Sequence, residues 1–78
     1  MGEITIKADV AGRICMLAIS VGQVVNEGDE IVVVEAMKME IPLPCPASGK
    51  VKSILVSVDE VIAEGQILMI VERETIKT

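Results

Sequence analysis

One lysine of this chain stands where its type and spacing could carry chemistry. Lys38 lies between two methionines, Met37 and Met39, at the point where two strand-like runs meet. A lysine amine can act as a catalytic base when it is buried, or as a group that other proteins handle when it is displayed. A lone surface lysine is usually only solvated, but exposed, adaptable methionines suit a surface that several partners contact in turn. Lys38 is therefore the residue to explain.

The link between the two runs breaks the usual rule for tight hairpins. Residues 31–35 and 40–43 read as strands, and the short space between them requires a tight turn. Such turns favour Asn-Gly or Asp-Gly because their central residues take positive φ, whereas methionine and lysine meet a steric cost there. A sequence that breaks local turn chemistry at one point and obeys it elsewhere marks that point as strained or functional.

The chain is an internal duplication. A shift of 37 positions pairs Gly12 with Gly49 and Gly28 with Gly65. The same shift gives further identical pairs: Ser20/Ser57, Val21/Val58, Val24/Val61, Glu27/Glu64, Val34/Val71 and Glu35/Glu72. Two copies are too few for a solenoid, so we expect the halves to close on one shared core with pseudo-two-fold symmetry.

Each copy is expected to contribute four short strands. Val and Ile dominate, and apolar runs last about four to six residues between Gly, Pro, Asn and Asp. The expected strands are residues 3–7, 13–19, 23–26, 30–36, 39–44, 50–56, 60–63 and 66–72. We therefore predict an all-β fold, a flattened barrel or sandwich of two four-stranded antiparallel sheets. It would form a single domain over residues 1–78, with a core of about 3–73 and a frayed tail of 74–78.

Particular glycines and prolines refine this prediction. Gly28 and Gly65 lie in matching turns where glycine can supply positive φ. Gly12 and Gly49 are expected at matching bends or close backbone contacts.

Three prolines, Pro42, Pro44 and Pro46, lack an amide donor. Their spacing predicts that residues 41–47 form a sheet edge or an irregular connection.

The duplication predicts that the lysine turn is the tip of the domain. The strand ending at Glu35 leads into this turn, and the equivalent strand ending at Glu72 leads to the C-terminus. A two-fold operation places the turn and the termini at opposite ends. A lysine at the tip is poorly placed as a buried base and well placed to be handed to another protein. A turn there also offers little to bury Met37 and Met39 against.

Composition excludes several function classes. A chain of 78 residues leaves no room for a large catalytic cleft, and a net charge of -5 with no aromatic residue argues against binding nucleic acid. No apolar run approaches the roughly 20 residues that span a bilayer, so we expect a soluble, cytoplasmic protein without membrane insertion. Two cysteines without histidine argue against a metal site. Cys15 and Cys45 are expected to be small apolar side chains, although sequence leaves a disulfide between them open.

The segment 35–39, Glu-Ala-Met-Lys-Met, resembles the attachment motif of biotinyl carrier domains, in which the central lysine is biotinylated. The resemblance runs from Ile4 to about Glu72 and includes the glycine positions and residues 47–49, Ala-Ser-Gly. It implies a flattened β-barrel with the modified lysine on a hairpin opposite the termini. Sister lipoyl domains share that fold but typically place an aspartate directly before the lysine. This chain has Met37 there, which favours biotin.

The resemblance implies a biotin carboxyl carrier module that is not itself an enzyme. A biotin protein ligase would use ATP to join biotin to Lys38. A biotin carboxylase would then load carboxylate onto the biotin, and a carboxyltransferase or decarboxylase subunit would pass it on. Met37 and Met39 would contact the ligase and position the arm, with packing of the hairpin as the alternative role. Ala36 would allow close approach of partners, and Glu35 would meet basic partner residues or serve structure, as its repeat Glu72 indicates.

Other functions stay open on sequence alone. The chain could be a lipoyl carrier module of a 2-oxoacid dehydrogenase or glycine cleavage system, a protein that takes both groups, or an unmodified interaction domain. Sequence does not identify the carboxyl acceptor, the parent complex or the oligomeric state. It also does not distinguish a free-standing protein from a domain of a longer one.

Overall fold

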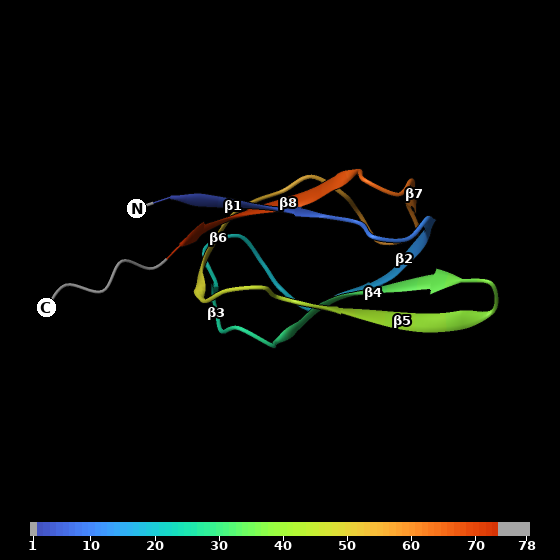
Figure 1. Ribbon diagram of the computed structural model, residues 1–78, viewed down its shortest axis with the longest axis horizontal. Coiled ribbons are helices and arrows are strands. Elements are labelled where there is room, and N and C mark those ends of the chain that lie inside the picture. The colour runs from blue at the N-terminus through green and yellow to red at the C-terminus, as the bar shows by residue number, and fades with distance from the viewer. Residues whose placement is uncertain (1, 74–78) are drawn as a thin grey trace, which may run out of the picture.

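The computed structural model describes residues 2–73 and confirms the all-β prediction (Figure 1). Its strands are β1 Glu3–Lys7, β2 Gly12–Leu17, β3 Val24–Val25, β4 Glu30–Ala36, β5 Met39–Pro44, β6 Gly49–Ile54, β7 Val61–Ile62 and β8 Ile67–Arg73. The predicted frayed tail, residues 74–78, lies outside the described residues.

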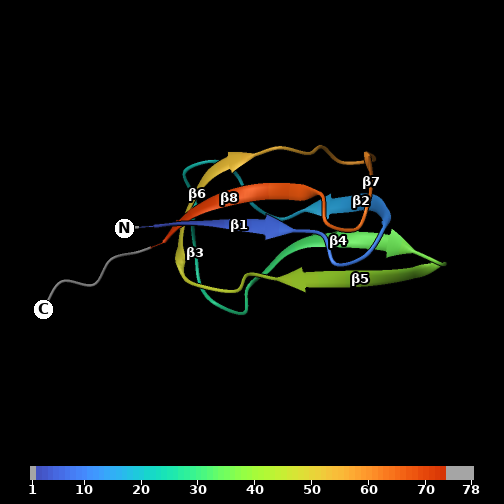
Figure 2. The same ribbon diagram turned by 45° about the horizontal axis from the view of Figure 1, so that its top comes forward.

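The strands form two antiparallel sheets of four, in the orders β1-β8-β6-β3 and β5-β4-β2-β7 (Figure 2). The shift of 37 positions maps β1 onto β5, β2 onto β6, β3 onto β7 and β4 onto β8. Applied to the first sheet, this mapping reproduces the strand order of the second. The predicted duplication is therefore confirmed as a pseudo-two-fold relation between the two sheets.

The core lies between the sheets and consists of aliphatic side chains from both copies. Ile14, Ile31, Leu68 and Val71 are completely buried. Burial of each such side chain stabilises the fold by roughly 1.5–3 kcal/mol relative to leaving it exposed. No buried polar or charged side chain occurs among residues 2–73, so the described core is held together by apolar packing.

Both cysteines are free thiols, which answers the question that sequence left open. Cys45 is buried in the core, with its Sγ 3.0 Å from the carbonyl oxygen of Ala47. Cys15 is half-buried, with its Sγ 3.3 Å from the carbonyl oxygen of Val33. The two residues act as small, mostly apolar side chains, as predicted.

Two predicted strands, 13–19 and 50–56, were placed too far along the chain. β2 and β6 begin at Gly12 and Gly49 and end at Leu17 and Ile54. They end early because the chain then crosses to the other sheet. After β2, for example, the amide of Gly22 donates to the carbonyl oxygen of Val51 in the opposite sheet, at 2.8 Å.

Gly12 and Gly49 occupy equivalent points of close backbone approach, as the sequence predicted. A Cβ at Gly12 would overlap the carbonyl oxygen of Glu35 and lie 2.8 Å from Cγ1 of Val34. A Cβ at Gly49 would meet Glu72 and Val71 in the same way. The absence of a side chain therefore lets β2 pack tightly on β4, and β6 on β8.

The hairpin that carries Lys38 differs from every other connection in the described chain. β4 and β5 are consecutive strands that pair directly, whereas each other link between consecutive strands passes from one sheet to the other. β5 is an edge strand, which accommodates Pro42 and Pro44 and confirms the predicted edge. The hairpin extends to the end of the molecule away from both labelled termini (Figure 1).

Candidate functional site

The turn at the end of the β4–β5 hairpin has the strained conformation that its sequence predicted. Ala36 pairs with Met39, which leaves Met37 and Lys38 as the two central residues. Their φ angles are 51° and 63°. Positive φ at both positions is the pattern of a type I′ turn, which normally uses asparagine and glycine. The chain thus holds two residues other than glycine in a backbone conformation that is unfavourable for residues with a side chain.

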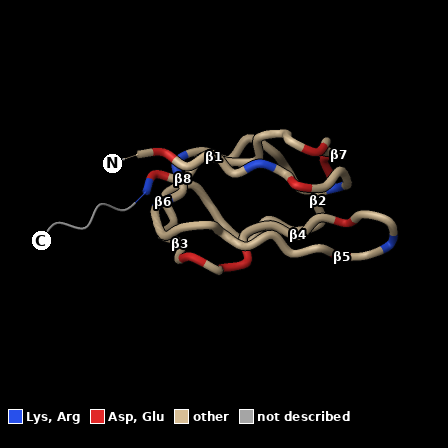
Figure 3. Tube along the Cα trace, viewed as in Figure 1, with Lys and Arg blue, Asp and Glu red and all other residues tan. Residues whose placement is uncertain are grey.

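The side chains of this turn point into solvent. Met37 is 90% exposed and Met39 is 63% exposed, as expected for a tip with nothing to pack against. Lys38 is exposed, and its amine makes no hydrogen bond or ion pair with any described residue. Figure 3 shows one basic segment at the end of the β4–β5 hairpin, and the other basic segments lie off this hairpin. The amine is therefore free to be approached from outside.

The strain at Met37 leads to a stability prediction. Replacing Met37 with asparagine, which tolerates the left-handed region, should stabilise the fold by about 0.5–1 kcal/mol. Urea denaturation of the two proteins would measure this as a rise in midpoint at constant m-value. A lower midpoint for Met37→Asn would contradict the claim that Met37 is held at a local conformational cost.

The base of the hairpin is built differently from its tip. Ala36 is buried at 8% exposure and lies opposite Met39 in the ladder. Glu35 is half-buried and lies opposite Glu40, and two like charges in that relation destabilise a sheet. Both residues therefore have a place in the structure of the hairpin. Their predicted roles in partner recognition stay predictions.

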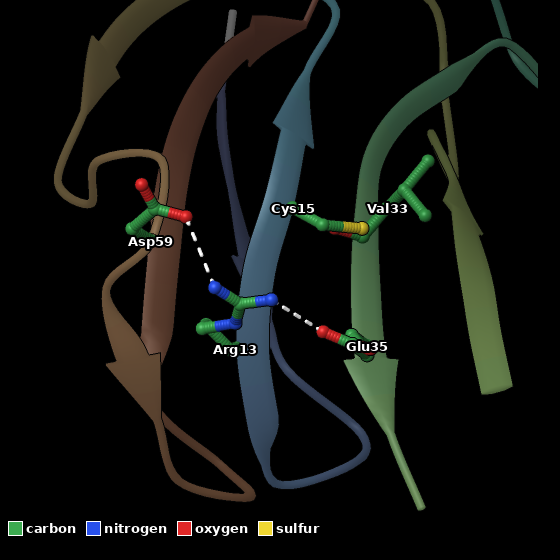
Figure 4. A network of polar contacts seen from close by, with 5 residues as sticks. All are labelled: Arg13, Cys15, Val33, Glu35 and Asp59. Carbon is green, nitrogen blue, oxygen red and sulfur yellow. Dashed lines mark hydrogen bonds and ion pairs between the residues drawn. The ribbon is translucent and has the colours of Figure 1, made fainter. Parts of the chain in front are cut away.

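Arg13 of β2 compensates the charge of Glu35 (Figure 4). Its Nη2 lies 2.5 Å from Oε1 of Glu35, and its Nη1 lies 3.3 Å from Oδ1 of Asp59 in the loop before β7. The hydrogen bond and the charge of Glu35 raise the pKa of Arg13 above its ordinary value. The guanidinium therefore links β4, β2 and the loop before β7 at the end of the molecule that carries the lysine.

This network occurs in only one of the two copies. The positions equivalent to Arg13, Glu35 and Asp59 are Lys50, Glu72 and Gly22. Gly22 has a φ of 91°, and Asp59 keeps the same left-handed conformation at 76° without being glycine. Apolar patterning and turn chemistry did not predict this network, although the mismatch of Gly22 with Asp59 at the shift of 37 is a signal of it in the sequence.

Replacing Asp59 with glycine, the residue of the other copy, should change the free energy of unfolding by less than about 0.5 kcal/mol. The ion pair that is lost is exposed and contributes little to stability, and relief of the left-handed conformation offsets its loss. Thermal unfolding followed by circular dichroism would measure the net effect. A large loss of stability would mean that the network, and not the apolar core, holds the loop before β7 in place.

Other kinds of site find no support in the part of the chain that the structure describes. Residues 2–73 contain no group of three or more histidine, cysteine or acidic side chains placed to hold a metal ion. They also contain no helix long and apolar enough to cross a membrane. The candidate for chemistry rests on the displayed amine of Lys38 and the strained, exposed turn that carries it.

Comparison with known proteins agrees with the resemblance. The profile of a family described as "Biotin-requiring enzyme" matches residues 5–71. Methylmalonyl-CoA decarboxylase subunit gamma of Veillonella parvula is 40% identical over 45 residues, which cover 58% of this chain and 35% of the relative. The chain therefore spans about a third of the length of that relative.

Solved structures share the fold at high similarity. A single-chain, multi-domain long-chain acyl-CoA carboxylase matches with a TM-score of 0.88 and 32% identity, over 94% of this chain and 7% of that chain. The urea carboxylase of Kluyveromyces lactis matches with a TM-score of 0.85 and 26% identity, over 92% of this chain and 6% of that chain. Each match is to a small part of a much larger carboxylase.

Proposed function

We propose that biotin is joined to the amine of Lys38, because this chain belongs to the family of biotin-requiring enzymes and is a biotin carrier domain. One observation carries the proposal. The amine stands in a strained, exposed turn at the end of the one described hairpin that stays within a single sheet, with methionines on both sides. Such a turn offers a modifying enzyme one nucleophile, with an exposed methionine on each side of it.

The chain's own part in attachment is to present Lys38. A biotin protein ligase, spending ATP, would form an amide between the carboxyl group of biotin and Nζ of Lys38, which removes one positive charge. The exposed thioethers of Met37 and Met39 would supply an adaptable apolar surface for that ligase. Arg13 would hold Glu35, and with it the base of the hairpin, in place during the encounter.

After attachment, the domain would act by tethering. Bound biotin supplies the nitrogen that carries carboxylate between active sites, and the bond-making belongs to partner enzymes. A rigid barrel with a flexible arm at one end converts encounters in solution into intramolecular ones, with effective concentrations on the order of millimolar. We infer that the partners are a biotin carboxylase and a carboxyltransferase or decarboxylase subunit. The similar proteins, a decarboxylase subunit and two carboxylases, support this inference.

Intact-mass spectrometry tests this function. The chain would be incubated with ATP and either biotin and a biotin protein ligase, or lipoate and a lipoyl ligase. We expect the mass to rise by one biotinyl group in the first reaction and to stay unchanged in the second. Peptide mapping should place the group on Lys38. A lipoyl adduct alone would establish the alternative carrier function, and no adduct in either reaction would contradict a carrier role.

A further inference from the structure

The outer edge of β1 is an unpaired strand edge with a particular arrangement of charges. The carbonyl oxygen of Gly2 accepts from Arg73, and Ala8 both donates to Gln66 and accepts from Gly65, so the even-numbered residues face β8. Backbone groups alternate in direction along an antiparallel strand. The N–H and C=O groups of Glu3, Thr5 and Lys7 therefore point away from β8, where no described strand pairs with them (Figure 2).

The pseudo-two-fold relation provides an internal comparison for this edge. The equivalent strand, β5, is the edge of the other sheet, and its outward positions are Glu40, Pro42 and Pro44. Two of these three positions lack an N–H donor, which prevents pairing with another strand. Thr5 and Lys7 stand where β5 has the prolines. The duplication has thus left one edge blocked and the other able to form hydrogen bonds.

The open edge is complementary to itself. If two β1 strands pair antiparallel about Thr5, then Glu3 lies opposite Lys7 of the other copy, and Thr5 lies opposite Thr5. Opposite charges and Thr–Thr pairs in directly opposed positions each stabilise antiparallel strands. All three side chains are exposed on the outer face of the sheet. A lysine on an edge strand usually discourages association, but in this register it meets a carboxylate.

We propose that a second copy of this chain binds at β1, so that two four-stranded sheets join across a two-fold axis at Thr5 into one sheet of eight strands. The interface is isologous, as a closed dimer requires. Because the two β1 strands run in opposite directions, the two hairpin tips point to opposite ends of the dimer. Each Lys38 therefore stays accessible, and pairing does not compete with attachment at the tip.

The surroundings of β1 leave room for such a neighbour. No Cα of β1 lies within 8 Å of a Cα of β5, whereas adjacent paired strands lie about 4.8 Å apart. A groove of about 240 Å³ runs beside this edge, lined by residues of both strands, among them Ile6, Leu43 and Pro44. Glu3 already pairs with Lys52 through Oε2, and its Oε1 is left to accept from a second ammonium group.

The contact is short, so the dimer should be weak. Five residues per strand bury less area than the stable interfaces of about 1,200–2,000 Å², and a dissociation constant on the order of 100 µM is expected. Sedimentation velocity over a range of about 10 µM to 1 mM, at low salt, would detect it as a rising average mass. Added salt should weaken the dimer because its charged pairs are exposed.

Thr5→Pro is the decisive variant, because Pro42 shows that the fold accepts proline at the equivalent position. This variant removes the central donor of the interface and should stay monomeric throughout the range, with unchanged thermal stability. A second pair of variants tests the charges. Lys7→Glu should weaken self-association at least fivefold, and Glu3→Lys combined with Lys7→Glu should restore it.

The outcomes separate this proposal from the function proposed above. Thr5→Pro should accept biotin at the same rate as the unchanged chain, because the tip is free in both monomer and dimer. A monomeric unchanged chain at 1 mM would overturn the dimer, and so would a Thr5→Pro variant that associates as strongly as the unchanged chain. Neither result would affect the assignment of Lys38.

Discussion

Replacement of Lys38 with arginine should abolish attachment of biotin completely. Arginine keeps the positive charge and the length of the side chain, but its guanidinium stays protonated and is not acylated as an amine is. The turn should survive, since the hairpin is held by the β4–β5 ladder and not by the side chain of Lys38. Intact mass and streptavidin capture after reaction with a biotin protein ligase would measure the loss.

The matched control for this experiment is another exposed lysine. Lys50 lies on β6 toward the opposite end of the molecule, and Lys50→Arg should be biotinylated like the unchanged chain. Unfolding curves of both variants should superimpose on that of the unchanged chain. Streptavidin capture of Lys38→Arg would show that biotin is attached elsewhere, and the assignment of the site would then be wrong.

The sequence could predict the fold because the duplication restricts it strongly. Once Gly12 was aligned with Gly49, every strand of one copy had a counterpart in the other, and the same core had to serve both. Apolar alternation and turn glycines then placed the strands within a few residues. The ends of β2 and β6 were misplaced because apolar residues continue past them, and only the crossing between sheets ends the ladder.

The candidate site was predictable at its tip and not at its base. Met37 and Lys38 violate turn chemistry locally, so their strain could be inferred from sequence and is confirmed by their positive φ angles. The contacts of Arg13 with Glu35 and Asp59 join residues 22 and 46 positions apart in the chain. Such contacts depend on the register of β2 with β4 and on the position of the loop before β7. The periodicity of apolar residues does not specify either of them.

Replacing Gly12 or Gly49 with alanine should destabilise the fold by about 1–3 kcal/mol each. In both variants the new methyl group would overlap a backbone carbonyl oxygen, of Glu35 or of Glu72, and a backbone cannot move aside as a flexible side chain can. For a domain of this size, each kcal/mol corresponds to a fall of roughly 4–8 °C in Tm. Thermal unfolding of the two variants would measure the cost.

The two glycine variants should differ in attachment, because their positions differ relative to the tip. Gly12→Ala displaces Glu35 at the base of the hairpin, and should slow biotinylation of the folded protein severalfold. Gly49→Ala displaces Glu72, near the end of β8 and far from Lys38, and should leave that rate unchanged below its Tm. Equal slowing in both variants would show that attachment depends on overall stability. Slowing by Gly12→Ala alone would show that the tight packing of β2 on β4 sets how the hairpin presents its lysine.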